Sequence, residues 1–244
     1  MLAVGSLALT GCGQKNQSNP NAGKGGGTTS KSAPLQDLNI KSRDEVKDGG
    51  TVRFSIETLP TTWNALHIDG NTVDLSTTIM GFVGANNFDI AEDGTPKPDT
   101  DYLQSYDVQT NGGKQVVTLH LNPKARWNSG RTIDYTDYQA TWKANNGANE
   151  DFKMASSDGF NQIESVKKGD KDTDVVITYK ATYPDWTATW SSVMPKEGVG
   201  TPETFNNGWK QFKPEWFTGP FTLDRIDQAQ KTLYLKRNPC LLYT

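Results

Sequence analysis

The sequence is poor in the side chains that build disulfide frameworks and metal sites. It has only two cysteines and two histidines among 244 residues. Cys12 and Cys240 lie far apart in dissimilar contexts, so no disulfide framework is expected. His67 and His120 have no neighbour at ligand spacing, and without a cysteine pair a zinc site lacks its usual ligands. We therefore expect no metal and no other cofactor.

An excess of positive charge and a long apolar run are also absent. The formal net charge is −3 and charged residues make up 22% of the chain. This balance gives no basic surface for nucleic acid. The apolar opening, residues 1–10, is shorter than the roughly 20 residues that span a bilayer.

The sequence carries none of the common catalytic signatures. There is no Gly-x-Ser-x-Gly elbow, no His-Glu-x-x-His, no Cys-x-x-Cys and no nucleotide-binding fingerprint. Aspartate and glutamate total 28. Such abundance selects no particular carboxylate pair of the kind that glycosidases use. We expect a protein that is not an enzyme, and a carbohydrate-active or cell-wall lipoprotein stays open as an alternative.

The N-terminus has the pattern of a secreted lipoprotein. Its apolar opening is typical of the central region of a signal peptide. Leu9-Thr10-Gly11-Cys12 resembles the bacterial lipobox, whose cysteine is acylated and becomes the mature N-terminus. A chance cysteine in an apolar run is the alternative. No Lys or Arg precedes the apolar stretch, so residues 1–12 are interpreted as an incomplete signal peptide that ends at the lipidated Cys12.

Residues 13–48 fit the role of a tether. They are rich in Gly, Ser, Asn and Lys without periodicity, which predicts a flexible linker. Lipidation at Cys12 and such a linker together predict an extracytoplasmic protein, anchored by lipid to the outer face of the cell membrane.

Hydrophobic periodicity predicts several strands in the remaining chain. Residues 51–58 alternate Val52, Phe54 and Ile56 with polar neighbours, as a half-buried strand does. Residues 101–123 predict a hairpin in which Val117, Leu119 and Leu121 alternate and Asn111-Gly112-Gly113 forms the bend. The segment Val175–Tyr179 predicts a further strand. The segments GPFTLDRI and TLYLKRN predict a second hairpin.

Helical signals lie between these strands. Residues 74–83 favour a short helix with Leu75, Ile79 and Phe82 on one side. Asp134 is placed to cap a helix that carries Tyr135, Tyr138 and Trp142 and stops at Asn145-Asn146-Gly147. Strands and helices alternate without a steady βαβ rhythm. The predicted class is therefore mixed α/β (α+β).

Short motifs along the chain resemble the extracytoplasmic solute-binding proteins of peptide-type ABC transporters, the oligopeptide- and dipeptide-binding family. The matching segments are Gly49-Gly50-Thr51-Val52-Arg53-Phe54, Gly94-Thr95-Pro96, Val117–Leu121, Arg126-Trp127-Asn128-Ser129-Gly130, Asp134–Trp142, Ile163-Glu164-Ser165-Val166, Val175–Tyr179, Met194-Pro195-Lys196, Thr218-Gly219-Pro220-Phe221 and Leu235-Lys236-Arg237-Asn238-Pro239. The surroundings of Trp127 and Trp142 look most like lipoproteins of actinobacteria.

The resemblance implies a periplasmic-binding-protein-like fold with two lobes that close on a ligand at a hinge. It implies a solute-binding domain at 49–239, with lobe one formed by 49–63 and 209–239 and an inserted subdomain at 64–208. Lobe two would be missing. Residues 240–244 depart from the family pattern, which suggests a truncated or frame-broken gene with a foreign tail.

In function, the resemblance implies an ABC importer's substrate-binding lipoprotein, a monomer that captures peptides and delivers them to the permease and ATPase complex. The loop after the first strand supplies ligand-binding backbone in that family. The residues at this position are Asp69, Gly70 and Asn71, and the alternative is an ordinary Asp-Gly turn. Relatives on this scaffold also capture nickel complexes, haem, oligosaccharides or opines, so a non-peptide ligand stays open.

The large aromatic side chains are expected to fill the core. Trp63, Trp127 and Trp142 are interpreted as core residues, and Trp186 and Trp190 as residues that pack a helix. His67 is expected at a cleft edge or on the surface, and His120 on a strand.

Overall fold

The computed structural model describes residues 41–240. The expected signal peptide, the lipidation site Cys12 and the linker up to residue 40 lie outside this range, as does the end of the predicted foreign tail. Within the described range, no helix is long and apolar enough to cross a lipid bilayer.

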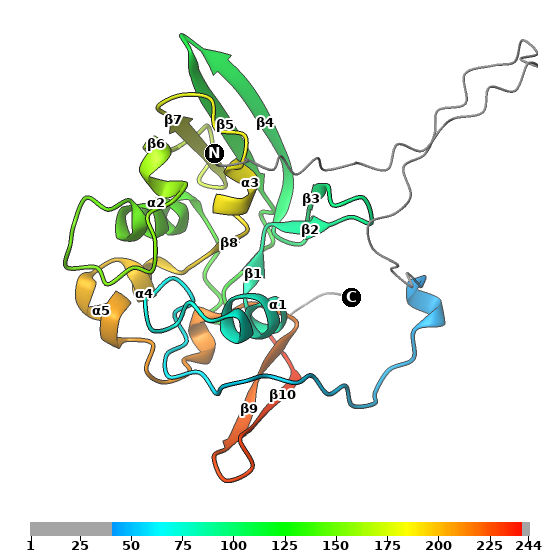
Figure 1. Ribbon diagram of the computed structural model, residues 1–244. Helices are drawn as coiled ribbons and strands as arrows, with labels where there is room; N and C mark the ends of the chain where they lie inside the picture. The colour runs from blue at the N-terminus through cyan, green and yellow to red at the C-terminus, as the bar shows by residue number, and fades with distance from the viewer. Residues whose placement is uncertain (1–40, 241–244) are drawn as a thin grey trace, which may run out of the picture. The chain divides into compact units, whose positions relative to one another are not determined.

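A four-stranded antiparallel sheet forms the first part of the fold (Figure 1). Its order is β4 (Leu103–Asn111), β5 (Lys114–Leu121), β7 (Asp174–Tyr179) and β6 (Ile163–Lys168). The predicted hairpin is confirmed, because the β4–β5 ladder closes at Asn111 and Lys114 around Gly112 and Gly113. Both glycines have positive φ, 57° and 81°, which such a tight bend requires.

Helix α2 (Tyr135–Asn145) packs on β6 and β7. Its start is fixed as the sequence predicts: the Asp134 side chain accepts a hydrogen bond from the backbone N–H of Thr136, and Asp137 accepts one from the N–H of Asp134. These reciprocal bonds satisfy donors that a helix start leaves open. The helix ends at the predicted stop, Asn145.

Short elements complete the chain. They are α1 (Met80–Val83) after a π-helical turn (Asp74–Ile79), β1 (Ala85–Asn86), β2 (Phe88–Ile90), β3 (Pro96–Pro98), α3 (Trp186–Thr189), β8 (Ser192–Val193), α4 (Lys196–Val199), α5 (Pro202–Asn207), β9 (Phe221–Asp227) and β10 (Thr232–Arg237), with 3-10 turns at Arg43–Glu45, Phe160–Gln162 and Pro214–Trp216. The pairs β1–β8, β2–β3 and β9–β10 are antiparallel. The predicted second hairpin is therefore confirmed.

Two clusters of buried side chains hold these elements together. The first joins the sheet to α2 and α3 through residues such as Val117, Leu119, Tyr138, Ile177 and Trp190. The second lies around Trp63, Leu75, Phe205, Trp209 and Phe217. Burial of this much apolar surface is the main stabilising term of the fold.

The tryptophan predictions are largely confirmed. Trp63, Trp127, Trp186 and Trp190 are buried. Trp142 is only partly buried and packs against the first cluster, where its indole N–H donates to the carbonyl of Phe160 at 3.2 Å.

The predicted strand over residues 51–58 is wrong. The segment pairs with no strand among the described residues, and Val52 and Phe54 are exposed. Its backbone contact is instead with one carboxylate, because Asp74 accepts hydrogen bonds from the N–H groups of Glu57 and Thr58. Alternation makes a segment able to form a strand, but a strand also needs a partner with free hydrogen-bonding groups.

Candidate functional site

The loop over residues 64–72 contains the three residues that the family resemblance predicts to bind ligand, and internal hydrogen bonds hold it tightly. His67 accepts two backbone hydrogen bonds on its carbonyl, from Gly70 at 2.9 Å and from Asn71 at 3.0 Å. A Cβ on Gly70 would lie 2.0 Å from the carbonyl oxygen of Asn64. Only glycine fits there, so the turn is specified by its sequence.

The polarity of this loop follows from these bonds. The N–H groups of Asp69, Gly70 and Asn71 are all used internally, since that of Asp69 donates to Nδ1 of His67 at 3.1 Å. The carbonyl oxygens of Asp69 and Asn71 accept no hydrogen bond from the described residues. Residues 69–71 thus have two carbonyl acceptors without a partner among the described residues and no unused backbone N–H, while the Asn71 side-chain amide can both donate and accept.

His67 is buried, so its expected place at a cleft edge or on the surface is wrong. Because Nδ1 accepts the N–H of Asp69, the ring carries its proton on Nε2, and Nε2 finds no partner among the described groups. Burial lowers the pKa of His67, against the opposing charge of Asp69. The ring is therefore a neutral internal support of the loop.

Residues 153–155 run beside the loop as a second wall. The N–H of Ile68 donates to the carbonyl of Lys153, and the N–H of Ala155 donates to the carbonyl of Leu66, both at 2.9 Å. These bonds flank an antiparallel bridge between His67 and Met154. Two segments about 90 residues apart in the sequence are thereby fixed side by side.

A third wall comes from residues 188–192 and is anchored by Asn87. The buried Asn87 side chain donates to the carbonyl of Trp190 at 2.8 Å and accepts from the Tyr138 hydroxyl at 2.8 Å. Gly159, a few residues after the second wall, lies against Thr189 of the third wall: its φ is +76°, and a Cβ on it would lie 2.1 Å from Oγ1 of Thr189. Glycine at this position permits both the backbone conformation and the close approach.

Between these three walls lies a cavity of about 310 Å³. Asn71 lines it, together with five hydroxyl-bearing residues: Ser156, Tyr183, Thr189, Ser191 and Ser192. Leu66, Phe160 and Ala188 contribute apolar surface, and Asp158 contributes the one charged side chain of the lining. A concave site that combines apolar surface with convergent polar groups can hold a small ligand.

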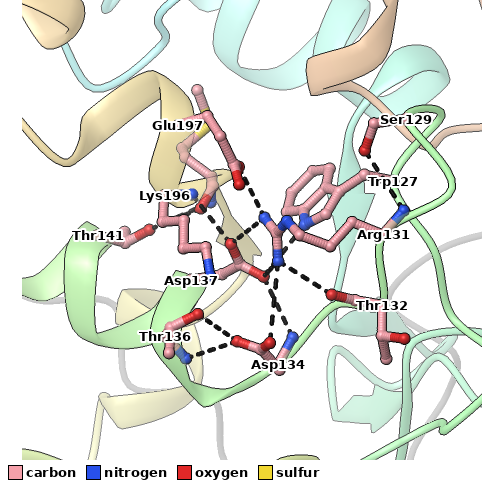
Figure 2. A network of polar contacts seen from close by, with 11 residues as sticks. Trp127, Ser129, Arg131, Thr132, Asp134, Thr136, Asp137, Thr141, Lys196 and Glu197 are labelled. Atoms are coloured by element: carbon pink, nitrogen blue, oxygen red, sulfur yellow. Dashed lines mark hydrogen bonds and ion pairs between the residues drawn. The ribbon is translucent and has the colours of Figure 1, made fainter.

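The densest charged cluster of the described residues lies elsewhere, around Asp137 (Figure 2). The fully buried Asp137 carboxylate accepts from two Arg131 nitrogens at 2.6 and 3.0 Å, from the Trp127 indole at 3.1 Å, and from the backbone N–H groups of Asp134 and Lys196. Glu197 binds the same guanidinium at 2.8 Å. These five hydrogen bonds leave the Asp137 carboxylate no open face for a substrate.

The charges of this cluster stabilise one another. Burial alone would lower the pKa of Arg131, but the hydrogen bonds and charges of Asp137 and Glu197 outweigh it and raise that pKa. The cluster joins the turn after Trp127, the start of α2 and α4. Its role is therefore structural.

Comparison with known proteins gives the family. The sequence model of the bacterial extracellular solute-binding proteins, family 5, middle part, matches residues 91–243. The oligopeptide-binding protein OppA of Mycobacterium tuberculosis is 33% identical over 97% of this chain. The chain belongs to family 5 of the bacterial extracellular solute-binding proteins.

Solved structures of family 5 type share the fold. The periplasmic EDTA-binding protein EppA matches 74% of this chain with a TM-score of 0.66 and 24% identity. The oligopeptide-binding protein AppA of Bacillus subtilis, solved with a nonapeptide, matches 75% with a TM-score of 0.61 and 19% identity. The predicted mixed, periplasmic-binding-protein-like fold is thus confirmed.

The match to these proteins is partial in length. The chain spans 40% of OppA, 34% of EppA and 35% of AppA. The described residues therefore correspond to part of the family 5 fold. The division into lobe one (49–63 and 209–239) and an inserted subdomain (64–208) stays a prediction.

Family 5 membership also bears on activity and location. The family and the matched relatives are described as binding proteins. Because the family is extracellular, the chain works outside the cytoplasm.

The three predicted ligand-binding residues lie in different settings. Asn71 lines the cavity, Asp69 projects into solvent, and Gly70 is buried against Asn64. The sequence analysis did not select the other two walls. Asp158-Gly159 reads as an ordinary turn and Ser191-Ser192 follows no periodic pattern, so only the tertiary fold brings them to Asn71.

Proposed function

We propose that this chain is the substrate-binding component of an ABC importer that captures peptides outside the cell. In this proposal Asp69, Gly70 and Asn71 contribute to the ligand site, together with the cavity beside them. The ligand is then delivered to a membrane permease and its ATPase.

One observation carries the peptide assignment. A chain related to an oligopeptide-binding protein holds a cavity beside a loop in which the carbonyl oxygens of Asp69 and Asn71 accept no hydrogen bond from the described residues. A peptide carries an N–H group at nearly every residue, and it can donate to such carbonyls as an added strand does. The hydroxyl-rich cavity next to the loop would receive a side chain.

Binding of this kind works by a shift between open and closed states. The ligand stabilises the closed state only if it makes more favourable contacts there than in the open state. The tight internal bonding of the 64–72 loop supports this role, because a preorganised wall loses little conformational entropy when a ligand docks.

Membrane attachment is part of the proposal. Acylation of Cys12 and a tether through residues 13–48 would keep a monomeric binding protein near its permease. Metabolic labelling with radioactive palmitate tests this: we expect label on the wild-type protein and none on Cys12→Ser. Equal label on both proteins would contradict the anchor.

Native mass spectrometry of the full chain mixed with a defined library of short peptides tests the ligand class. Main-chain recognition predicts a heterogeneous set of retained peptides. The substitution Asn71→Pro removes no carbonyl but distorts the acceptor loop, so it should reduce retention. The exposed residue Asp170 provides a control position, where Asp170→Asn should retain the same set.

A non-peptide ligand is the second candidate. The likeness in fold to an EDTA-binding protein, at a TM-score of 0.66, favours a small chelate or a similar anion. In that case native mass spectrometry of protein purified from its own host would show one discrete small molecule, and the peptide library would leave the spectrum unchanged.

A further inference from the structure

The cavity beside Asn71 has an uneven distribution of charge. Its lining includes no lysine, arginine or histidine, and Asp158 is its one charged residue. The Asp158 carboxylate makes no ion pair or hydrogen bond with the described residues; only its backbone N–H is used, in a bond to Oγ of Ser156 at 3.0 Å. This carboxylate is therefore available to a guest.

The other polar groups of the cavity reinforce this preference. The backbone carbonyl of Asn71 accepts no hydrogen bond from the described residues, and the Asn71 side-chain amide and each of the five hydroxyl groups can accept as well as donate. The backbone donors of the loop are already used, at Asp69, Gly70 and Asn71. A guest that brings several donors and a positive charge matches this lining better than an anion does.

The apolar part of the cavity selects the shape of the guest. Leu66, Phe160 and Ala188 provide a surface along which a methylene chain can lie. Long cationic side chains combine an apolar stem with a charged end. The volume of about 310 Å³ is at the lower limit of ligand pockets. It suits one side chain better than a whole peptide.

We infer that this cavity is a subsite for a cationic side chain of the guest, of the lysine or ornithine type, with its stem on Leu66, Phe160 and Ala188 and its ammonium group paired with Asp158. This inference rests on the proposed function, because it assigns one part of a bound peptide to one cavity.

A matched set of peptides tests the subsite. Each peptide is penta-alanine with one residue replaced by Lys, Gln or Glu, at each position in turn, and dissociation constants are measured by titration calorimetry with the full chain. Gln retains most of the stem and carries no charge. We expect the Lys peptide to bind roughly three- to tenfold more tightly than the Gln peptide at the best position.

Substitutions at residue 158 separate charge from other effects. In Asp158→Asn, the affinity for the Lys peptide divided by that for the Gln peptide should fall to about one. In Asp158→Lys, the Glu peptide should bind more tightly than the Lys peptide. Asp170→Asn removes the same charge from the exposed turn between β6 and β7 and should keep the wild-type ratio. Since each ratio compares two peptides on one variant, a general loss of stability cancels.

The outcomes distinguish this inference from the proposed function. Peptides that bind without any Lys preference, or with a preference that survives Asp158→Asn, would overturn the subsite and leave peptide binding standing. If no peptide binds, N-acetyl-lysine methylamide serves as the probe in NMR titrations. Shifts of the Asp158 and Ser192 amides that disappear in Asp158→Asn would then support the subsite and reject the peptide ligand; unchanged amides would reject both.

Discussion

Two segments with the same alternating pattern of apolar and polar residues differ in structure: one is a buried strand and the other is largely exposed and forms no strand with the described residues. Val52, Phe54 and Ile56 alternate with polar residues, as Val117, Leu119 and Leu121 do. The second set is β5, where Val117 is 0% exposed. In the first set Val52 is 76% and Phe54 60% exposed. Alternation predicts which side chains share a face, but it does not supply the surface that covers them.

The neighbours of the two segments explain the difference. β5 pairs with β4 on one side and with β7 on the other, so its backbone groups are satisfied within the sheet. Residues 51–56 form no such ladder with the described residues, and Phe54 touches a single ring, that of Phe82, at 5.3 Å between centroids. Side chains of the same pattern should therefore contribute very differently to the free energy of unfolding in the two segments. The following substitutions test this.

The largest effect is expected at Asp137, which fixes the start of α2, the helix that packs on the four-stranded sheet. Asp137→Ala would leave the Arg131 guanidinium and the Trp127 indole without their buried partner. Breaking a buried ion pair from one side costs about 3–5 kcal/mol. Urea unfolding should show that loss. Asp170→Ala, at an exposed position, should stay near wild type, and equal midpoints for all three proteins would contradict the structural role.

A matched pair of substitutions compares the two segments directly. Val117→Ala removes two methyl groups from a closed core and should cost about 1.5–3 kcal/mol. Val52→Ala removes the same groups from an exposed side chain and should change the free energy of unfolding by less than about 0.5 kcal/mol. Similar costs at both positions, measured by urea unfolding, would show that residues 51–56 are covered in solution.

The outer face of β5 should show a smaller effect that depends on pH. Hydrogen bonding to Asp174 at 2.9 Å raises the pKa of His120 above its ordinary value of 6.5; burial opposes this, and Asp107 adds to it. A raised histidine pKa stabilises the fold fully below the unfolded pKa, and this gain is lost as the pH rises through the folded pKa. The ring is partly in solvent, so the gain is below about 1 kcal/mol.

The comparison of wild type with His120→Asn at about pH 5.5 and about pH 9 measures this gain. We expect the stability difference between them to be larger at the lower pH. A difference that stays constant, or grows with pH, would mean that His120 is not charged in the fold. Asp107→Asn removes only the outer carboxylate and should give an intermediate result.

A similarly small effect is expected at Phe54, in the same exposed segment as Val52. Because the Phe54 ring is mostly in solvent and, among the aromatic rings of residues 41–240, contacts that of Phe82 alone, Phe54→Ala should cost about 0.5 kcal/mol. A loss of more than about 2 kcal/mol, which is typical of a buried aromatic residue, would place the segment in a packed environment.

Local patterns predicted much of the fold. The hairpin closing at Gly112 and Gly113, the capped start of α2 at Asp134 and the β9–β10 pair are all present. Each of these depends on residues close together in the chain. The positions that failed, 51–58 and His67, depend on what distant segments do.

The candidate site shows the same division. The sequence indicated Asp69, Gly70 and Asn71, and the loop they form is closed by its own hydrogen bonds to His67. The sequence did not indicate Asp158 as a binding residue, because an Asp-Gly pair is common in ordinary turns. Asp158 lines the cavity because the neighbouring Gly159 lies close against Thr189, in the wall that Asn87 holds from elsewhere in the fold.

The sequence by itself therefore determined the family, the mixed class and the elements whose hydrogen bonds close within short stretches. Tertiary structure alone decided which alternating segment became a buried strand, where polar groups converge on one cavity, and that the Asp158 carboxylate lines this cavity without a partner among the described residues. The physical reason is that burial and pairing are properties of two surfaces, and a local pattern describes only one of them.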